Sequence, residues 1–186
     1  MRIIGGKYKG RKIEAPRGLL SRPPLALIRE SVFNILGDWV IGKSVLDLFA
    51  GSGSLGIEAL SRGAAQLRYV DSARRCVEMA RRNFEKLGVS DVAVITRQHA
   101  VDFVRTWPGP RFDLVFVDPP FLSGKVQEIL DCLPGAGILS DDGVLVCRYH
   151  RREDINIPGK FKMYKKRKFG ESIVVFLRPV SSEVTP

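Results

Sequence analysis

The four residues Asp118-Pro119-Pro120-Phe121 follow an apolar run, residues 112–117, that predicts a buried strand. Consecutive prolines fix φ and carry no N–H, so we expect the carbonyl of Pro119 to stay outside any strand ladder and accept a hydrogen bond. An ionised Asp118 is a second acceptor, and Phe121 offers a flat apolar face. Two acceptors beside a ring suit an exocyclic amino group on a planar base. The alternative is a plain turn, because Asp-Pro commonly opens turns.

A second candidate site is a glycine loop that runs from Asp47 to Gly56. The apolar residues 44–49 predict a buried parallel strand, and glycines at 51, 53 and 56 precede or enter a helical pattern over 54–62. A strand, a glycine loop and a helix in succession let backbone N–H groups approach a ligand closely. The G-x-G-x-x-G spacing alone fits a dinucleotide, another nucleoside ligand, or a tight turn with no ligand.

Two further strand ends carry polar groups. Asp71 follows one predicted strand, 20 residues after Gly51, where a carboxylate can accept both hydroxyls of a ribose. The same aspartate could instead cap the helix that follows it. The next predicted strand leads to His99 and Ala100, where a side chain and a backbone N–H could address an adenine edge. Ligands in α/β sheets bind outside the carboxyl ends of the strands, so these positions belong to one candidate site.

These candidate residues need a sheet that brings strand ends together. Alternating strands and helices from residue 44 onward predict a parallel sheet that helices cover on both faces. We expect an α/β, Rossmann-like fold with a mostly parallel seven-stranded sheet, an antiparallel C-terminal hairpin, and a small N-terminal β-hairpin and helix. Strands are expected over 2–4, 11–13, 44–49, 66–70, 92–96, 112–117, 143–147, 160–167 and 172–177, and helices over 54–62, 73–87, 99–106 and 124–133. A first helix, which Pro23-Pro24 could open, is expected to end at Gly37.

The net charge of +10 is concentrated in two segments. Residues 1–30 carry +6 and residues 148–168 carry +7, which leaves the remainder slightly acidic. Two basic segments that flank a near-neutral core indicate a polyanionic partner. A membrane surface would instead require a basic amphipathic helix, and neither segment has that period.

The bulk composition excludes several classes of protein. A chain of 186 residues that is 45% hydrophobic suits one main domain with a proper core. No apolar run approaches the ~20 residues of a membrane span, and no signal-peptide core follows Met1, so we expect a cytoplasmic protein. The three cysteines are widely spaced and do not pair with the two histidines at ligand spacing, so we expect neither a disulfide framework nor a metal site.

In combination, residues 47–53 and the Asp-Pro-Pro-Phe motif resemble the S-adenosylmethionine-dependent amino methyltransferases. In that group the first motif holds the cofactor and (D/N)-P-P-(F/Y/W) holds the target amine. The motifs at residues 2–6, 22–23 and 29–34 narrow the resemblance to the RsmD-type 16S ribosomal RNA guanine-N2 methyltransferases of bacteria, over residues 1 to about 178. The chain departs from that family's usual pattern at Pro24, Ala26 and His99.

The resemblance implies a class I methyltransferase that uses S-adenosyl-L-methionine to methylate a guanine N2 amine in 16S rRNA during rRNA processing. Its partner would be ribosomal RNA or an assembling small subunit, with no membrane, and we expect a monomer. A basic hairpin and linker (1–23), a methyltransferase domain (24–178) and a tail (179–186) are expected. The expected catalytic residues are Asp118, Pro119, Pro120 and Phe121; the cofactor-binding residues are Asp47, Ala50, Gly51, Gly53, Asp71, Ser72, His99 and Ala100; and the RNA-binding residues are Arg2, Lys7, Lys9, Arg11, Lys12, Arg22, Lys165 and Lys166.

Three alternatives stay open. An amino methyltransferase that acts on another RNA, or on DNA adenine or cytosine, can share Asp-Pro-Pro-Phe, although 186 residues leave no separate target-recognition domain. A nicotinamide dehydrogenase would need a proton donor near the strand ends and gives that motif no role. A basic assembly factor that binds ribosomal RNA without catalysis would not require both the intact loop and the intact motif.

Overall fold

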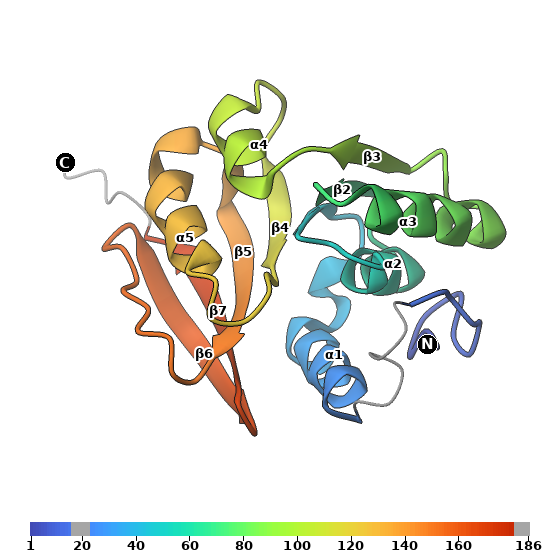
Figure 1. The fold of residues 1–186 in the computed structure, drawn as a ribbon, viewed down its shortest axis with the longest axis horizontal. Helices are drawn as coiled ribbons and strands as arrows, with labels where there is room; N and C mark the ends of the chain where they lie inside the picture. The colour runs from blue at the N-terminus through green and yellow to red at the C-terminus, as the bar shows by residue number, and fades with distance from the viewer. Residues whose placement is uncertain (16–22, 181–186) are drawn as a thin grey trace. The chain divides into compact units, whose positions relative to one another are not determined.

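The computed structural model describes residues 1–15 and 23–180. The chain divides into two compact units, Met1–Ala100 and Val101–Pro186 (Figure 1). The predicted RNA-binding residue Arg22 and residues 181–186 of the predicted tail lie outside the described residues. The proposed division at residues 23 and 178 stays a prediction.

The first unit is a parallel sheet with helices packed on it. The strand order is β3-β2-β1, and the central strand pairs in parallel with both neighbours. Helix α2 contacts β1 and β2, and α3 lies along β2 and β3 (Figure 1). In chain order the elements are α1 (Pro23–Leu36), a 3-10 helix (Gly37–Val40), β1 (Ser44–Leu48), α2 (Ser54–Ser61), β2 (Gln66–Asp71), α3 (Arg74–Leu87) and β3 (Ala93–Arg97).

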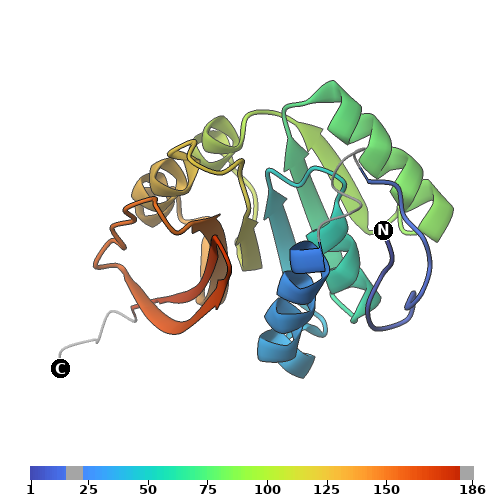
Figure 2. The same ribbon diagram turned by 60° about the horizontal axis from the view of Figure 1, so that its bottom comes forward.

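The second unit combines one parallel strand pair with an antiparallel hairpin. Its strand order is β4-β5-β7-β6, where β4 and β5 are parallel and β7 is antiparallel to both β5 and β6. Figure 2 shows β6 and β7, in red, as a long curved hairpin. After α4 (Ala100–Thr106), the elements are β4 (Phe112–Val117), α5 (Lys125–Ala136), β5 (Leu139–His150), β6 (Phe161–Phe169) and β7 (Ser172–Pro179).

The hydrophobic pattern of the chain explains these elements. On α3, Val77, Ala80, Phe84 and Leu87 recur at three- and four-residue steps and are all buried, while Gly88 ends the helix with φ +70°. The apolar residues 173–177 are buried along β7, as the run predicts. The predicted α/β fold is therefore confirmed, and the seven strands among the described residues pair in both directions.

The N-terminal segment differs from the prediction of two short strands. Its ladder is one isolated antiparallel bridge between Arg2 and Lys12. The N–H of Ile3 donates to the carbonyl of Arg11 at 3.1 Å, and both Ile3 and Ile13 are buried. A regular hairpin does not continue beyond this bridge because the next N–H groups bond to a side chain on α2 instead.

A buried carboxylate fastens the N-terminal segment to α2. The side chain of Glu58 is 1% exposed and accepts the N–H groups of Ile4 at 2.9 Å and Gly5 at 2.8 Å. It also pairs with Arg62 at 2.9 Å and lies 3.5 Å from the buried guanidinium of Arg29. Glu58 therefore joins three segments of the first unit.

We expect Glu58→Ala to destabilise the protein strongly. The substitution leaves the buried Arg29 without its carboxylate and two backbone N–H groups without an acceptor, which typically costs about 3–5 kcal/mol. The measurement is the free energy of unfolding from denaturant titration. Glu78→Ala is the matched control, since Glu78 also pairs with an arginine four residues away but its side chain is 48% exposed. Equal unfolding free energies for the two variants would contradict the prediction.

Candidate functional site

The carboxyl ends of β1, β2 and β3 bring the predicted cofactor-binding residues to one edge of the first unit. These strands are parallel and in register, so residues that end them lie side by side. The end of β1 and its loop supply Asp47, Ala50, Gly51 and Gly53; the end of β2 supplies Asp71 and Ser72; and the end of β3 supplies His99 and Ala100. Their role toward a ligand stays a prediction.

The backbone of the glycine loop is held by side chains of β2. Residues Phe49, Gly51 and Gly53 have φ of +57°, +56° and +76°, which are left-handed conformations. The N–H of Gly51 donates to Asp71 Oδ2 at 2.8 Å, and the hydroxyl of Tyr69 donates to the carbonyl of Gly51 at 2.7 Å. Both backbone groups of Gly51 are thus fixed from the neighbouring strand.

Asp71 bonds in two directions. Its Oδ2 holds Gly51, and its Oδ1 accepts the N–H of Ala73 at 2.8 Å, in the turn before α3. This second bond lies before α3 and is not a helix cap, because the N-cap residue of α3 is Ala73 and no side chain caps the helix there. It is only half-buried, and each carboxylate oxygen keeps the capacity for a further hydrogen bond. The ribose interpretation is compatible with this geometry.

Asp47 holds the end of the glycine loop through a buried hydrogen bond. Its side chain is buried, and its Oδ2 accepts the N–H of Gly56 at 2.9 Å. A Cβ at Gly56 would lie 2.6 Å from the methyl carbons of Leu67, so glycine lets α2 approach β2 without a shift of that side chain. Asp47 thereby sets where α2 begins relative to β1.

Asn83 is a further loop residue that the sequence interpretation missed. It is fully buried on α3, and its amide donates to the carbonyls of Ser52 and Glu14, each at 3.1 Å. Its Oδ1 accepts the N–H of Glu14 at 2.7 Å, which ties the N-terminal segment to α3 (Figure 2). The available signal was an amide on the otherwise apolar face of that helix.

The ends of β2 and β3 are also tied together. The N–H of Gln98 donates to the carbonyl of Asp71 at 3.2 Å, and Arg97 Nε donates to the carbonyl of Ser72 at 3.3 Å. His99 is exposed, and Ala100 is buried at the start of α4. The proposed ribose and adenine contacts therefore lie on adjacent strand ends.

The Asp-Pro-Pro-Phe motif lies directly after β4 in the second unit. Pro119 is buried, and among the described residues none donates a hydrogen bond to its carbonyl. The carbonyl of Pro120, by contrast, accepts the hydroxyl of Ser123 at 2.6 Å. The role of the Pro119 carbonyl as an acceptor for a target amine stays a prediction.

Arg148 on β5 contacts both ends of this motif and was not predicted as a site residue. Its Nε lies 2.5 Å from Asp118 Oδ1, and its guanidinium carbon lies 4.7 Å from the ring centroid of Phe121. His150, two residues on and hence on the same face of β5, has its ring centroid 5.3 Å from that of Phe121. The sequence signal for these two site residues was the alternation of polar side chains at the end of an apolar strand.

The environment of Asp118 acts on its pKa in two opposing ways. Burial raises the pKa of Asp118 above its ordinary value because it disfavours the charged form. The nearby Arg148 guanidinium opposes this shift through its charge and its hydrogen bond. The two side chains are 25% and 19% exposed, so the pair is neither deeply enclosed nor fully solvated.

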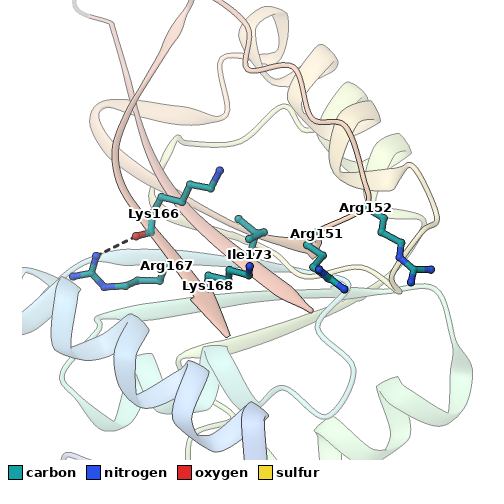
Figure 3. A pocket seen from close by; sticks show the side chains of 6 residues that line it. All are labelled: Arg151, Arg152, Lys166, Arg167, Lys168 and Ile173. Atoms are coloured by element: carbon teal, nitrogen blue, oxygen red, sulfur yellow. Dashed lines mark hydrogen bonds between the residues drawn. The ribbon is translucent and has the colours of Figure 1, made fainter. Parts of the chain in front are cut away.

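A basic pocket lies beyond the end of β5. Its cavity volume is about 710 Å³, and five of its six lining side chains are cationic (Figure 3). Glu171 connects the pocket with the preceding site, because it pairs with both Arg151 at 2.8 Å and His150 at 3.1 Å. Of the two RNA-binding residues predicted here, Lys166 lines the pocket and Lys165 does not. The lining residues are Arg151, Arg152, Lys166, Arg167, Lys168 and Ile173.

The predicted basic residues of the N-terminal segment are exposed. Lys7 and Arg11 lie over the ring of Tyr8 at 5.4 and 5.6 Å, which gathers cations around an aromatic side chain. The guanidinium groups of Arg2 and Arg11 donate to backbone carbonyls, whereas Lys9 and Lys12 extend from the surface. Within residues 1–15 and 23–180, no helix is long and apolar enough to cross a membrane, and no cluster of potential metal ligands is found.

A model of the family described as Conserved hypothetical protein 95 matches residues 1–178. The chain belongs to this family. A putative rRNA methyltransferase of Bacillus subtilis, YlbH, is 33% identical over 175 residues, which are 91% of this chain and 94% of that protein. Ribosomal RNA small subunit methyltransferase D of Escherichia coli K12 is 31% identical over 172 residues, or 92% and 86% of the two chains.

Solved structures agree with this membership. The putative methyltransferase yhhF of Escherichia coli has a TM-score of 0.87 and 30% identity, and the match covers 96% of this chain and 97% of that one. The putative methylase HI0767 of Haemophilus influenzae has a TM-score of 0.83 and 28% identity over 96% and 98%. The family and the class I methyltransferase fold that the sequence motifs indicate are thereby confirmed.

We expect Arg148→Met to raise the pKa of Asp118 further. The variant keeps an apolar side chain over Phe121 but removes the cation that opposes the effect of burial. Titration of ¹³C-labelled aspartate carboxyl groups by NMR measures the pKa in both proteins. Arg111→Met is the control, because Arg111 pairs with a different aspartate, Asp141, near the surface. A lowered or unchanged pKa of Asp118 in Arg148→Met would contradict the assignment.

Proposed function

We propose that this protein transfers a methyl group from S-adenosyl-L-methionine to the exocyclic N2 amine of a guanine in small-subunit ribosomal RNA. The names of its relatives support ribosomal RNA as the substrate. One observation carries the choice of an amine: Asp118 and Phe121 together hold a planar N–H donor, which in this structure is the guanidinium of Arg148. A guanine amine presents the same combination of a donor and a flat face.

The donor half of the reaction belongs to the glycine loop. With Gly51 fixed by Asp71 and Tyr69, the loop backbone needs no rearrangement to accept a ligand. The ribose hydroxyls of the cofactor would bond to Asp71, and its adenine would lie beside His99 and the N–H of Ala100. The loop thereby orients the sulfonium methyl of the donor.

The acceptor half raises the reactivity of a poor nucleophile. The lone pair of a guanine N2 amine is delocalised into the ring. Hydrogen bonds from its two protons to Asp118 and the carbonyl of Pro119 favour a pyramidal nitrogen with a localised lone pair. The nitrogen then attacks the methyl carbon in line, the C–N bond forms and the C–S bond breaks. The proton leaves late, to Asp118 or water, and S-adenosylhomocysteine is released.

Alignment contributes most of the rate in this scheme, since close orientation can supply ~7–11 kcal/mol in favourable cases. A paired guanine must first leave its stack, at a cost of a few kcal/mol. Contacts to the RNA backbone outside the reacting base would provide binding energy for that step. The basic pocket beyond β5 and the exposed lysines of the N-terminal segment are suited to phosphates, which position the RNA without reading its sequence.

The assay that tests the function uses labelled S-adenosylmethionine. It compares free ribosomal RNA, small ribosomal subunits from cells that lack this gene, and duplex DNA, and then identifies the methylated nucleoside after digestion. Label in N2-methylguanosine from small-subunit RNA supports the proposal. Label in methyladenine or methylcytosine of DNA, or no label with any substrate, contradicts it.

We expect Asp118→Ala to lower methyl transfer by about 100-fold or more, because misplacement of a reacting group commonly has an effect of that size. Binding of S-adenosylmethionine should persist, since Asp118 is not among the residues assigned to the donor. Radiometric transfer and isothermal titration calorimetry measure the two quantities. Asp142→Ala, which removes an exposed carboxylate, is the control. Near-wild-type turnover in Asp118→Ala would contradict the role of the motif.

We expect the loss of basic side chains at either surface to flatten the salt dependence of RNA binding. Each lost phosphate contact lowers the slope of log K against log salt by about 0.7 for single strands, so three lost contacts lower it by about 2. Fluorescence titration at several salt concentrations measures the slope. Three glutamine triple variants are compared: Arg152, Lys166 and Lys168 in the pocket; Lys7, Lys9 and Lys12 in the N-terminal segment; and Arg75, Arg81 and Lys86 on α3 as the control.

The control triple removes the same charge from a surface to which no phosphate is assigned, so its slope should equal that of the wild type. A slope that falls equally in all three variants would mean that net charge alone sets the affinity. That result would contradict specific phosphate contacts at both surfaces.

A further inference from the structure

We infer that Arg148 is the resident occupant of the target-amine subsite and that the guanine must displace it to be methylated. This inference rests on the proposed function and extends it. Arg148 makes both of the interactions that the proposal assigns to the target base: it donates to Asp118 Oδ1 at 2.5 Å and stacks near Phe121 at 4.7 Å. The guanine and the guanidinium therefore compete for the same carboxylate and the same ring.

The chemistry of the two groups explains why they are interchangeable. The N1–C2–N2 edge of guanine is itself a guanidine unit, with three nitrogens around one planar carbon. It presents N–H donors on N1 and N2, and an arginine presents a similar planar fork to a carboxylate. Both have a flat face that an aromatic ring can cover. A site that holds the arginine side chain is therefore preformed for the guanine edge.

Two side chains of β5, Arg148 and His150, contact the ring of Phe121. His150 lies on the same face of the strand and contacts Phe121 with its ring plane at 63° to the phenyl plane. The carboxylate of Glu171 lies 3.1 Å from His150 Nε2 and 2.8 Å from Arg151 Nε, which connects this side of Phe121 to Arg151. With His150 on one side, the guanidinium of Arg148 is the group that a stacking base would replace.

The ion pair between Arg148 and Asp118 is of a kind in which another donor can replace the arginine. Both side chains are partly exposed, so water reaches the ion pair and offsets part of its contribution to stability. Displacement frees a cation beside a polyanion, so the released guanidinium can bond to an RNA phosphate. After the exchange, Asp118 bonds to the guanine and Arg148 bonds to a phosphate. Two sets of charge-assisted hydrogen bonds therefore replace the one between Arg148 and Asp118.

The subsite itself distinguishes bases by the donors that they offer to Asp118. A base that enters must replace a donor to Asp118, and uracil has no exocyclic amine to do so. Adenine and cytosine have the amine but lack the adjacent ring N–H that guanine offers as a second donor. Specificity is a difference between affinities, and a resident competitor raises the apparent KM of every base by the same factor, so the choice of base belongs to Asp118. Arg148 is thus a competitor for the subsite rather than a catalytic residue.

The kinetic consequence follows from the population of the open site. If Arg148 occupies the subsite about nine-tenths of the time, the apparent KM for RNA is about tenfold higher than for an open site. Arg148→Met should therefore lower the KM for RNA about tenfold, which corresponds to about 1.4 kcal/mol.

The control is Arg178→Met. Arg178 also covers an aromatic ring, that of Tyr164 at 4.8 Å, but has no contact with the Asp-Pro-Pro-Phe motif. The Arg178→Met variant removes the same charge from the same unit as Arg148→Met. A change in KM that both variants share is therefore an effect of charge alone. A lower KM that is found only in Arg148→Met supports the inference. A fall in kcat with an unchanged KM in Arg148→Met overturns it, because Arg148 would then position Asp118 for catalysis.

A second measurement follows the displacement directly. In ¹⁵N-labelled wild-type protein, the Nε–H resonance of Arg148 should be shifted by the ring of Phe121 and protected by Asp118. Addition of substrate RNA with S-adenosylhomocysteine should move this resonance to the position of an arginine that lacks both contacts. A resonance that stays unchanged while the wild-type protein methylates the same RNA overturns the inference and leaves the proposed function intact. Absence of methylation by the wild type rejects the proposed function instead.

Discussion

The hydrogen bond from the N–H of Gly51 to the carboxylate of Asp71 is the contact on which the conformation of the glycine loop, the proposed donor site, depends. It crosses from the loop after β1 to the end of β2, and it is made at a residue whose φ is +56°. The hydroxyl of Tyr69 holds the carbonyl of the same glycine from the same strand. The loop conformation is therefore set by the neighbouring strand before any ligand arrives, and less ordering remains to oppose binding.

Three aspartates near strand ends illustrate how the partner of a carboxylate determines its role. Asp47 and Asp71 accept backbone N–H groups, which cannot move without changing the fold. Asp118 pairs with the side chain of Arg148, which can rotate away. The first two carboxylates bond to the backbone, while the third bonds to another side chain. In the proposed reaction this distinction separates the donor half, which is held by backbone contacts, from the acceptor half, where we infer an exchange of partners.

Local patterns were sufficient to predict most of the fold. The period of α3 and the glycine after it predicted its end correctly, and the apolar run of β7 predicted a buried strand. The β5 strand was predicted too short, because Arg148 and His150 interrupt its apolar pattern, yet both lie on the strand. The N-terminal hairpin was predicted too regular, since its ladder ends where Glu58 takes the backbone N–H groups of Ile4 and Gly5.

What the sequence determined by itself was the set of chemical groups and the strand ends that carry them. Glycines, aspartates and consecutive prolines have conformational and hydrogen-bonding properties that hold wherever they occur, so their spacing predicted the loop, the motif and the family. Only the tertiary structure decided which groups meet. The contacts of Glu58 with Gly5, Asn83 with Ser52 and Arg148 with Asp118 join residues 53, 31 and 30 positions apart. No local pattern encodes such pairs, because they form when separate strands and helices pack together.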